Sequence, residues 1–487
     1  MSRARAAIFA LAWIVLIPSV GLIAWHLYES HAWESHRRGL IASGKLPSWE
    51  SMIPPTVTEA ENFAMIPSLA PLREHLAMPW ADRPQELPNP IIFGEITAFG
   101  TIAAESLLIN SARGERPSLV ALHAALAKSG CANGDLEPAI AILAALEPHR
   151  LLLDEIASGA RRSSSRLPIN YDNGLAHGSI AYSHFRRLGA TLAARCLSRS
   201  QLGLVDEAAS DIITLLRIGR ALKKDPTLYC VLTGVALDEW AANLIWDGVI
   251  THHWNSPNLL SFREALGGAE NLTALRCAYT MEGLNWIRVT ESYLRGDKPT
   301  WGVTPGLDPA PVLESEPFWI RWTSLYLWRK SLHILADGTS ALQVCLQIRG
   351  GFFEIDRFDR WRIEIDRFRV PNSFVGLGFF ESKQVGRPLL HALHASAALR
   401  FARLACRLEA EFLSTGRYPC KLAPGDADAI DIMGGTNLEY FVADNQQAYR
   451  LSSKGWKAME ALFEDDKTAP NWIRDWSWTF PELAKPR

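Results

Sequence analysis

The sequence predicts a mainly α-helical protein with one transmembrane helix at its N-terminus and a small β-hairpin near its C-terminus. Residues 6–28 hold no formally charged side chain, and a helix of that length spans about 34 Å, enough for a bilayer core of ~30 Å. Apolar residues in most of the remaining chain recur at steps of three and four, which is the helical period. Residues 438–452 instead indicate two short strands around Asp444-Asn445.

The composition is that of a folded protein and excludes one class of partner. The chain has 487 residues, 48% hydrophobic and 21% charged, and is long enough for two or three domains. A net charge of -2 argues against nucleic acid, which requires a basic excess. The seven cysteines have no zinc-type spacing and are predicted to be mostly buried thiols. Disulfides stay an alternative if the body faces an oxidising compartment.

The charges around the apolar segment predict its orientation. Arg3 and Arg5 precede it, so the positive-inside rule favours a cytoplasmic N-terminus at residues 1–5 and an exported body. We therefore expect a single-pass inner (cytoplasmic) membrane protein with a periplasmic or otherwise extracytoplasmic body, and lipid contact through residues 6–28. A cleaved signal peptide and a buried soluble helix are the alternatives. The apolar run is longer than a signal peptide needs, and Leu22-Ile23-Ala24 is a poor cleavage site.

Composition shifts divide the rest of the chain. The predicted regions are a juxtamembrane stalk and Pro-rich extended segment (29–94), a helical domain with antiparallel helix pairs (95–296), a Pro/Gly-rich loop (297–317), and a second helical part (318–487) with a long helix at 391–414 and the hairpin at 438–452. Prolines disfavour regular helix in the extended segment and the loop.

The clearest helical unit covers residues 183–246. One helix ends at Gly203, Asp206 is the expected N-cap of the next, and Asp225-Pro226 ends that one. Asp211 falls on the face predicted to be exposed to solvent. The pattern resembles one helix pair of tetratricopeptide-type repeats. No second copy follows at that repeat's period, so a plain helical hairpin is favoured over a repeat.

The C-terminal part contains one ambiguous stretch. Residues 340–368 fit both helical and alternating patterns, and helix is favoured. Residues 369–386 are predicted to form a loop before the long helix. On that helix the arginines lie opposite the apolar face, so they are expected to be solvated. These arginines are Arg400, Arg403 and Arg407.

No sequence motif identifies a catalytic, cofactor-binding or metal-binding residue. The chain lacks nucleotide-binding, zinc-protease and serine-hydrolase signatures, and no cofactor is predicted. His391 and His394, one helical turn apart, would supply half a metal site but are interpreted as surface residues. The Asp-rich stretch misses calcium-loop spacing and is predicted to line a turn. Its members are Asp426, Asp428 and Asp431.

A second acidic stretch, at residues 354–366, is a candidate source of a catalytic pair of carboxylates. Arginines interleave with its acidic residues. Such mixing predicts an exposed helix face with ion pairs between its own residues, whereas acid–base catalysis would need two carboxylates in a dry cleft. The acidic residues are Glu354, Asp356, Asp359, Glu364 and Asp366.

Three stretches carry a resemblance to a known group. They are Glu61-Asn62-Phe63-Ala64 with residues 67–72, the helix pair at 183–246, and residues 397–419 with the hairpin. Their order resembles a family of uncharacterised, single-pass bacterial proteins with a helical body, which implies a fold but no activity. The Gly416-Arg417-Tyr418-Pro419 helix exit also resembles that of type II secretion pseudopilins. This chain lacks their Asp-Pro-Trp-Gly stretch, and its apolar helix lies far from that exit.

Together these patterns predict a non-enzymatic, membrane-anchored envelope protein with a protein-interaction or scaffolding role. An envelope hydrolase whose site is scattered over several helices is the first alternative. An accessory factor of a secretion or pilus system is the second. The oligomeric state is not predicted.

Overall fold

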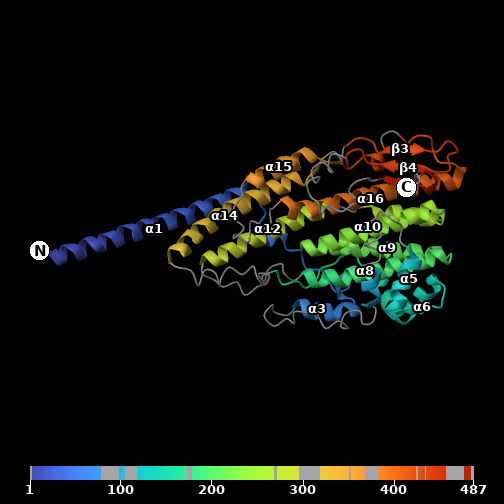
Figure 1. The fold of residues 1–487 in the computed structure, drawn as a ribbon, viewed down its shortest axis with the longest axis horizontal. Coiled ribbons are helices and arrows are strands. Elements are labelled where there is room, and N and C mark those ends of the chain that lie inside the picture. Colours follow the sequence, from blue (N-terminus) through green and yellow to red (C-terminus); the bar gives the residue numbers. More distant parts are fainter. Residues whose placement is uncertain are drawn as a thin grey trace.

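The computed structural model is mainly helical, and a long N-terminal helix projects from an elongated body of packed helices (Figure 1). A small sheet lies at the end of the body remote from the N-terminus. The structure describes residues 3–77, 98–104, 118–171, 178–267, 271–295, 318–349, 352–367, 382–423, 426–433, 435–456 and 477–483.

The first part of the chain supplies the projecting helix and the short helices on one side of the body. Its α-helices are α1 (Arg3–Ala42), α2 (Trp49–Met52), α3 (Ala70–Ala77), α5 (Leu119–Lys128), α6 (Pro138–Leu146) and α7 (Arg150–Gly159). The centre of the body is built from α8 (Gly178–Gln201), α9 (Val205–Lys223), α10 (Leu228–Ile250), α11 (Ser256–Leu266) and α12 (Asn271–Arg295).

The last part adds three helices and two small sheets. The helices are α14 (Phe318–Cys345), α15 (Ile355–Arg367) and α16 (Ser382–Thr415). One antiparallel pair joins β1 (Ile348–Arg349) and β2 (Phe352–Phe353), and an antiparallel three-stranded sheet has the order β3 (Glu439–Val442), β4 (Tyr449–Ser452), β5 (Ser477–Thr479).

Local sequence explains the helix ends at several points. The side chains of Ser118, Thr227 and Asn255 each accept a hydrogen bond from the backbone N–H three residues later, so each caps the helix that follows. Gly203 has φ +75° just after α8, a left-handed conformation that glycine adopts without steric cost.

The start of α9 differs from the prediction. Val205 is its first residue and Leu204 occupies the cap position without a side-chain hydrogen bond. Asp206 therefore lies in the first turn, where its Oδ1 accepts hydrogen bonds from the amides of Asn255 (3.2 Å) and Asn258 (2.9 Å). The carboxylate joins the start of α9 to the start of α11, a contact that the local capping pattern could not indicate.

The central helices approach closely because their interface contains glycine. α8, α9 and α10 pack on one another, and α10 also packs along α16. A Cβ atom on Gly234 would lie 2.6 Å from the backbone oxygen of Gly219, so no larger residue fits where α9 and α10 cross. Four of the seven cysteines are buried, in agreement with the prediction. They are Cys196, Cys230, Cys345 and Cys406.

The predicted hairpin at residues 438–452 is confirmed and is part of a larger sheet. β3 pairs with β4 in an antiparallel register that places Phe441 opposite Arg450. β5 adds a third strand that the sequence pattern did not predict. Trp478 of β5 stacks on Trp246 of α10, with ring centroids 5.0 Å apart, so the end of the chain packs back onto the central helices.

Two predictions for the C-terminal part need correction. Residues 340–368 do not form one helix, because α14 ends at Cys345 and the β1–β2 pair separates it from α15. The predicted loop at 369–386 ends early, since residues 382–386 already belong to α16, which contains Pro388. The remainder of that loop lies outside the described residues. Pro388 is the seventh residue of α16, so it removes one backbone hydrogen bond to the preceding turn, but the helix still begins at Ser382.

Candidate functional site

One described helix satisfies a length-and-composition test for a membrane span, and it is a core helix. α10 is 23 residues long, and 67% of its most apolar window is buried inside the body. It also contains Asp238 and Glu239, both buried. Over its described residues, α1 does not satisfy the same test. The predicted span at residues 6–28 therefore stays a prediction.

α1 nevertheless has two distinct halves. Its first half exposes a series of large apolar side chains, each between 48% and 69% exposed. They are Trp13, Leu16, Ile17, Val20, Ile23, Leu27 and Tyr28. Its second half packs on the body through Trp33, whose indole N–H donates to Glu291 Oε1 of α12 (2.8 Å), and Arg37, which pairs with the same oxygen (3.2 Å).

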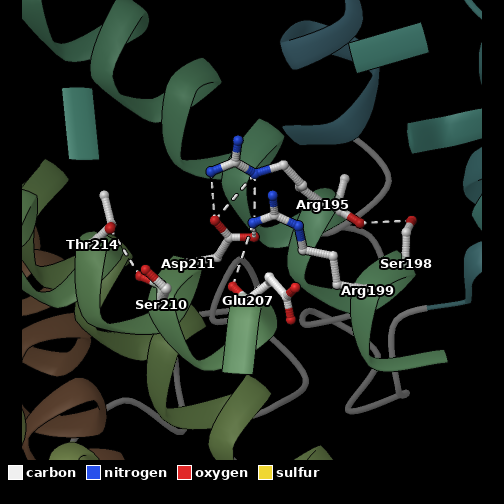
Figure 2. A network of polar contacts seen from close by, with 8 residues as sticks. Arg195, Ser198, Arg199, Glu207, Ser210, Asp211 and Thr214 are labelled. Carbon is white, nitrogen blue, oxygen red and sulfur yellow. Dashed lines mark hydrogen bonds and ion pairs between the residues drawn. The ribbon is translucent and has the colours of Figure 1, made fainter. Parts of the chain in front are cut away.

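The interface between α8 and α9 contains a buried ion-pair cluster (Figure 2). Asp211 is 2% exposed and accepts from Arg195 Nη2 (2.5 Å) and Arg199 Nη1 (2.8 Å). The prediction that Asp211 faces solvent is wrong. The helical period of α9 indicates which residues lie on the same face as Asp211, but it does not indicate what covers that face. In the structure α8 covers it and supplies both guanidinium groups.

The arginine face of α16 is partly covered, since the side chains of Arg403 and Arg407 are 30% and 29% exposed. Arg400 donates to the backbone oxygen of Ile430 (2.8 Å), and Arg403 pairs with Asp428 (3.0 Å). Arg407 pairs with Asp426. The turn of the Asp-rich stretch therefore lies over this face, held by ion pairs that the helix pattern alone could not predict.

The other predicted acidic and histidine groups have structural roles. Within α15 and the residue before it, Glu354 pairs with Arg357 (2.5 Å) and Asp359 pairs with Arg362 (2.8 Å), the predicted pairing along one helix. His394 is buried and lies 3.2 Å from Glu239, so the prediction that it is a surface residue is wrong. His391, one turn away, is exposed.

No group of three potential metal ligands occurs within the ranges that the structure describes. The acidic stretches and His394 thus form ion pairs and packing contacts, and none of these residues lines a cavity that the structure describes. A different arrangement, around His252, does.

His252 follows α10 in an unusual backbone conformation and makes a specific contact. Its φ is +52°, a left-handed conformation that is uncommon for a residue with a Cβ. Its Nδ1 lies 2.8 Å from Oε1 of Glu409, and its ring stacks on Phe412 with centroids 4.6 Å apart. Both partners belong to α16. The ring is therefore fixed at one nitrogen and on one face.

Glu409 is fully buried and shares its carboxylate between two partners. Its exposed fraction is 0%. Oε1 faces His252, and Oε2 accepts a hydrogen bond from the hydroxyl of Tyr418 (2.6 Å). Burial raises the pKa of Tyr418, so its phenol stays protonated and donates. A buried carboxylate needs such partners because its desolvation is costly.

A cavity of about 530 Å³ lies beside His252. Its lining consists of His252, Ala443, Asp444, Asn445, Gln447, Ala448 and Leu483. Most of these residues belong to the β3–β4 turn, so the hairpin places polar side chains next to a fixed imidazole. The cavity size is within the range of small-molecule sites.

Few features of the sequence indicate this arrangement. His252 and Glu409 are 157 residues apart, and His252 precedes a second histidine in what reads as a simple turn. The only local signal is the hairpin turn around Asp444-Asn445, whose position was predicted correctly. What it lies against depends on how α10 and α16 pack.

No family model, curated protein or solved structure matches this chain. The resemblance to single-pass bacterial proteins with a helical body therefore stays a prediction.

Proposed function

We propose that this protein is a single-pass membrane protein whose α1 anchors a helical body that binds another protein. The observation that carries the proposal is the division of α1 into two halves. Apolar side chains in its first half are exposed, whereas its second half is fixed to α12 by hydrogen bonds at Glu291. An exposed apolar helix is stable when lipid covers it. The charges at Arg3 and Arg5 favour an inner-membrane location with an exported body.

The body also exposes apolar side chains where a protein partner could bind. Gln201 at the end of α8 donates to Glu137 beside α6 (2.9 Å), which brings two chain segments together. Four large apolar residues flank this bond in the sequence, each at least 40% exposed. They are Leu136, Ile140, Leu202 and Leu204. We call these four residues the α6–α8 patch. Apolar surface of this kind favours protein association.

Vesicle flotation of the full chain tests the anchor. We expect the protein to float with phosphatidylglycerol-containing vesicles and to resist an alkaline wash. A Leu16→Arg/Val20→Arg variant should remain unbound, because each arginine at a membrane centre costs about 2.5–3.5 kcal/mol. The matched control, Val120→Arg/Leu151→Arg, adds the same charges at exposed positions of the body and should float. Equal flotation of both variants would contradict the anchor.

Proximity labelling from the body tests the partner site. The variant Ile140→Asp/Leu204→Asp should lose the proteins labelled by the unmodified chain, since charge in an apolar interface is costly to desolvate. Leu260→Asp, at another exposed apolar residue of the body (56% exposed), is the control and should keep them. If the two labelling patterns agree, the α6–α8 patch is not the partner site.

A further inference from the structure

The buried carboxylate of Glu409 fixes the hydrogen on His252. Neither oxygen of Glu409 pairs with lysine or arginine among the residues described; its partners are His252 and Tyr418. Because a carboxylate oxygen accepts, the ring nitrogen that faces it carries the hydrogen. In the neutral imidazole the other nitrogen, Nε2, is then an acceptor.

The polar groups around the cavity add further acceptors. Asp444 is exposed and has no hydrogen bond or ion pair within the described ranges, so its carboxylate is available. One N–H of the Gln447 side-chain amide donates to the backbone oxygen of Gly416 (2.9 Å), and its amide oxygen is a further acceptor. The second N–H of this amide and the two side-chain N–H groups of Asn445 are donors, while the Asn445 Oδ1 accepts from the backbone N–H of Gln447 (3.1 Å).

The cavity thus combines one uncompensated negative charge with several acceptors and an apolar wall. The wall consists of Ala443, Ala448 and Leu483. A ligand that matches this lining must be positively charged, must carry more than one N–H donor and must have an aliphatic part. Guanidinium groups meet the first two requirements because they present several donors in a plane and bind carboxylates through two hydrogen bonds.

We propose that this cavity binds an alkylguanidinium ligand, with Asp444 as its charge partner and Nε2 of His252 as a second acceptor. Glu409 and Phe412 act as positioning residues, because they hold the imidazole without lining the cavity. The left-handed backbone at His252 is consistent with a site whose geometry is imposed by its surroundings. This binding site is independent of the membrane anchor and of the α6–α8 patch.

Calorimetric titration of the full chain in detergent tests the proposal. The probe is n-butylguanidinium, and n-butyrate is the probe of opposite charge. We expect saturable one-to-one binding of the cation only. Asp444→Asn should weaken that binding on the order of tenfold to a hundredfold, as expected for loss of a charge-assisted hydrogen bond. His252→Asn, which tolerates the left-handed backbone, should weaken it about tenfold.

The control variant is Asp135→Asn. Asp135 is an exposed residue between α5 and α6, so this change alters the net charge equally without touching the cavity, and affinity should be unchanged. Thermal unfolding of each variant checks that the fold persists, and Asp444→Asn stays informative even if His252→Asn unfolds. No saturable binding of n-butylguanidinium, a preference for n-butyrate, or equal affinity in Asp444→Asn and Asp135→Asn would each overturn the proposal.

Discussion

Asp211 and Glu409 are both buried carboxylates on long helices, but their partners differ in kind. Asp211 lies between two guanidinium groups, those of Arg195 and Arg199. Both form ion pairs with its carboxylate, so charge is paired within the cluster. Glu409 instead faces an imidazole and a phenol. The imidazole of His252 has a second nitrogen and lines a cavity. A carboxylate with arginine partners fixes two helices together, whereas one with a histidine partner can position a group for a ligand.

The largest expected effect is at the cluster that we interpret as purely structural. Asp211→Ala leaves Arg195, whose side chain is 6% exposed, as an unpaired buried charge. We expect a loss of about 3–5 kcal/mol in the free energy of unfolding, measured by urea denaturation. Asp154→Ala, at an exposed pair with Arg150 (3.7 Å), should cost less than about 1 kcal/mol. If Asp211→Ala and Asp154→Ala lower the free energy of unfolding by similar amounts, the buried cluster at Asp211 does not have the structural role that we assign to it.

A third buried carboxylate, Asp225, has no arginine or histidine among its described hydrogen-bond partners and lies beside the phenol of Tyr171. It is 2% exposed and accepts from the backbone of Thr227. Burial raises its pKa from the ordinary 3.8 to about 6. In the unfolded chain it ionises first, so the free energy of unfolding should fall as the pH rises from about 4 to about 6. The fall is about 3 kcal/mol for two pKa units.

Asp225→Asn should remove this fall, since the amide does not titrate. The measurement is urea denaturation at a series of pH values across that window, with the unmodified chain and the variant compared at each. The variant should be the more stable of the two at neutral pH. Parallel pH profiles would show that Asp225 ionises in the folded protein as easily as in the unfolded one.

A smaller effect is expected at the histidine-paired carboxylate. Glu409→Gln removes the charge and keeps an acceptor oxygen for only one of the two partners, His252 and Tyr418. We therefore expect a loss of about 1–2 kcal/mol in the free energy of unfolding. The variant should nevertheless bind n-butylguanidinium more weakly, because the imidazole is no longer held by a carboxylate. Tyr418→Phe, which leaves the His252 contact intact, is the matched control for binding. A loss as large as that of Asp211→Ala would mean that Glu409 is mainly structural.

The smallest effect is expected at Glu291, whose side chain is 12% exposed and is therefore less buried than Asp211 and Glu409. Glu291→Gln weakens the bonds to Trp33 and Arg37 and should cost about 1 kcal/mol. Faster amide hydrogen exchange in residues 29–42 would locate the effect at the end of α1 that packs on the body. Unchanged exchange there would show that apolar packing alone holds this half of α1.

Sequence periodicity predicted the helices of the central unit, the long C-terminal helix and the hairpin because each depends on local spacing. It did not predict the burial of a side chain where a second helix or turn packs over that side chain. The period shows which residues share a face with Asp211 or Arg403, but the partners that cover those faces lie on α8 and in the turn that contains Asp428. The candidate site combines His252 with a residue 157 positions away, and no local pattern relates them.

The continuity of α1 has a mechanical consequence for an anchored protein. One helix of 40 residues passes from the exposed apolar half into the half that packs on α12 without a break. The helix therefore connects its two halves rigidly, unlike a flexible linker. Each residue inserted between Tyr28 and Trp33 would turn the body by about 100° and raise it by about 1.5 Å. In the anchored protein that we propose, the length of this segment would set which side of the body faces neighbouring proteins in the membrane plane.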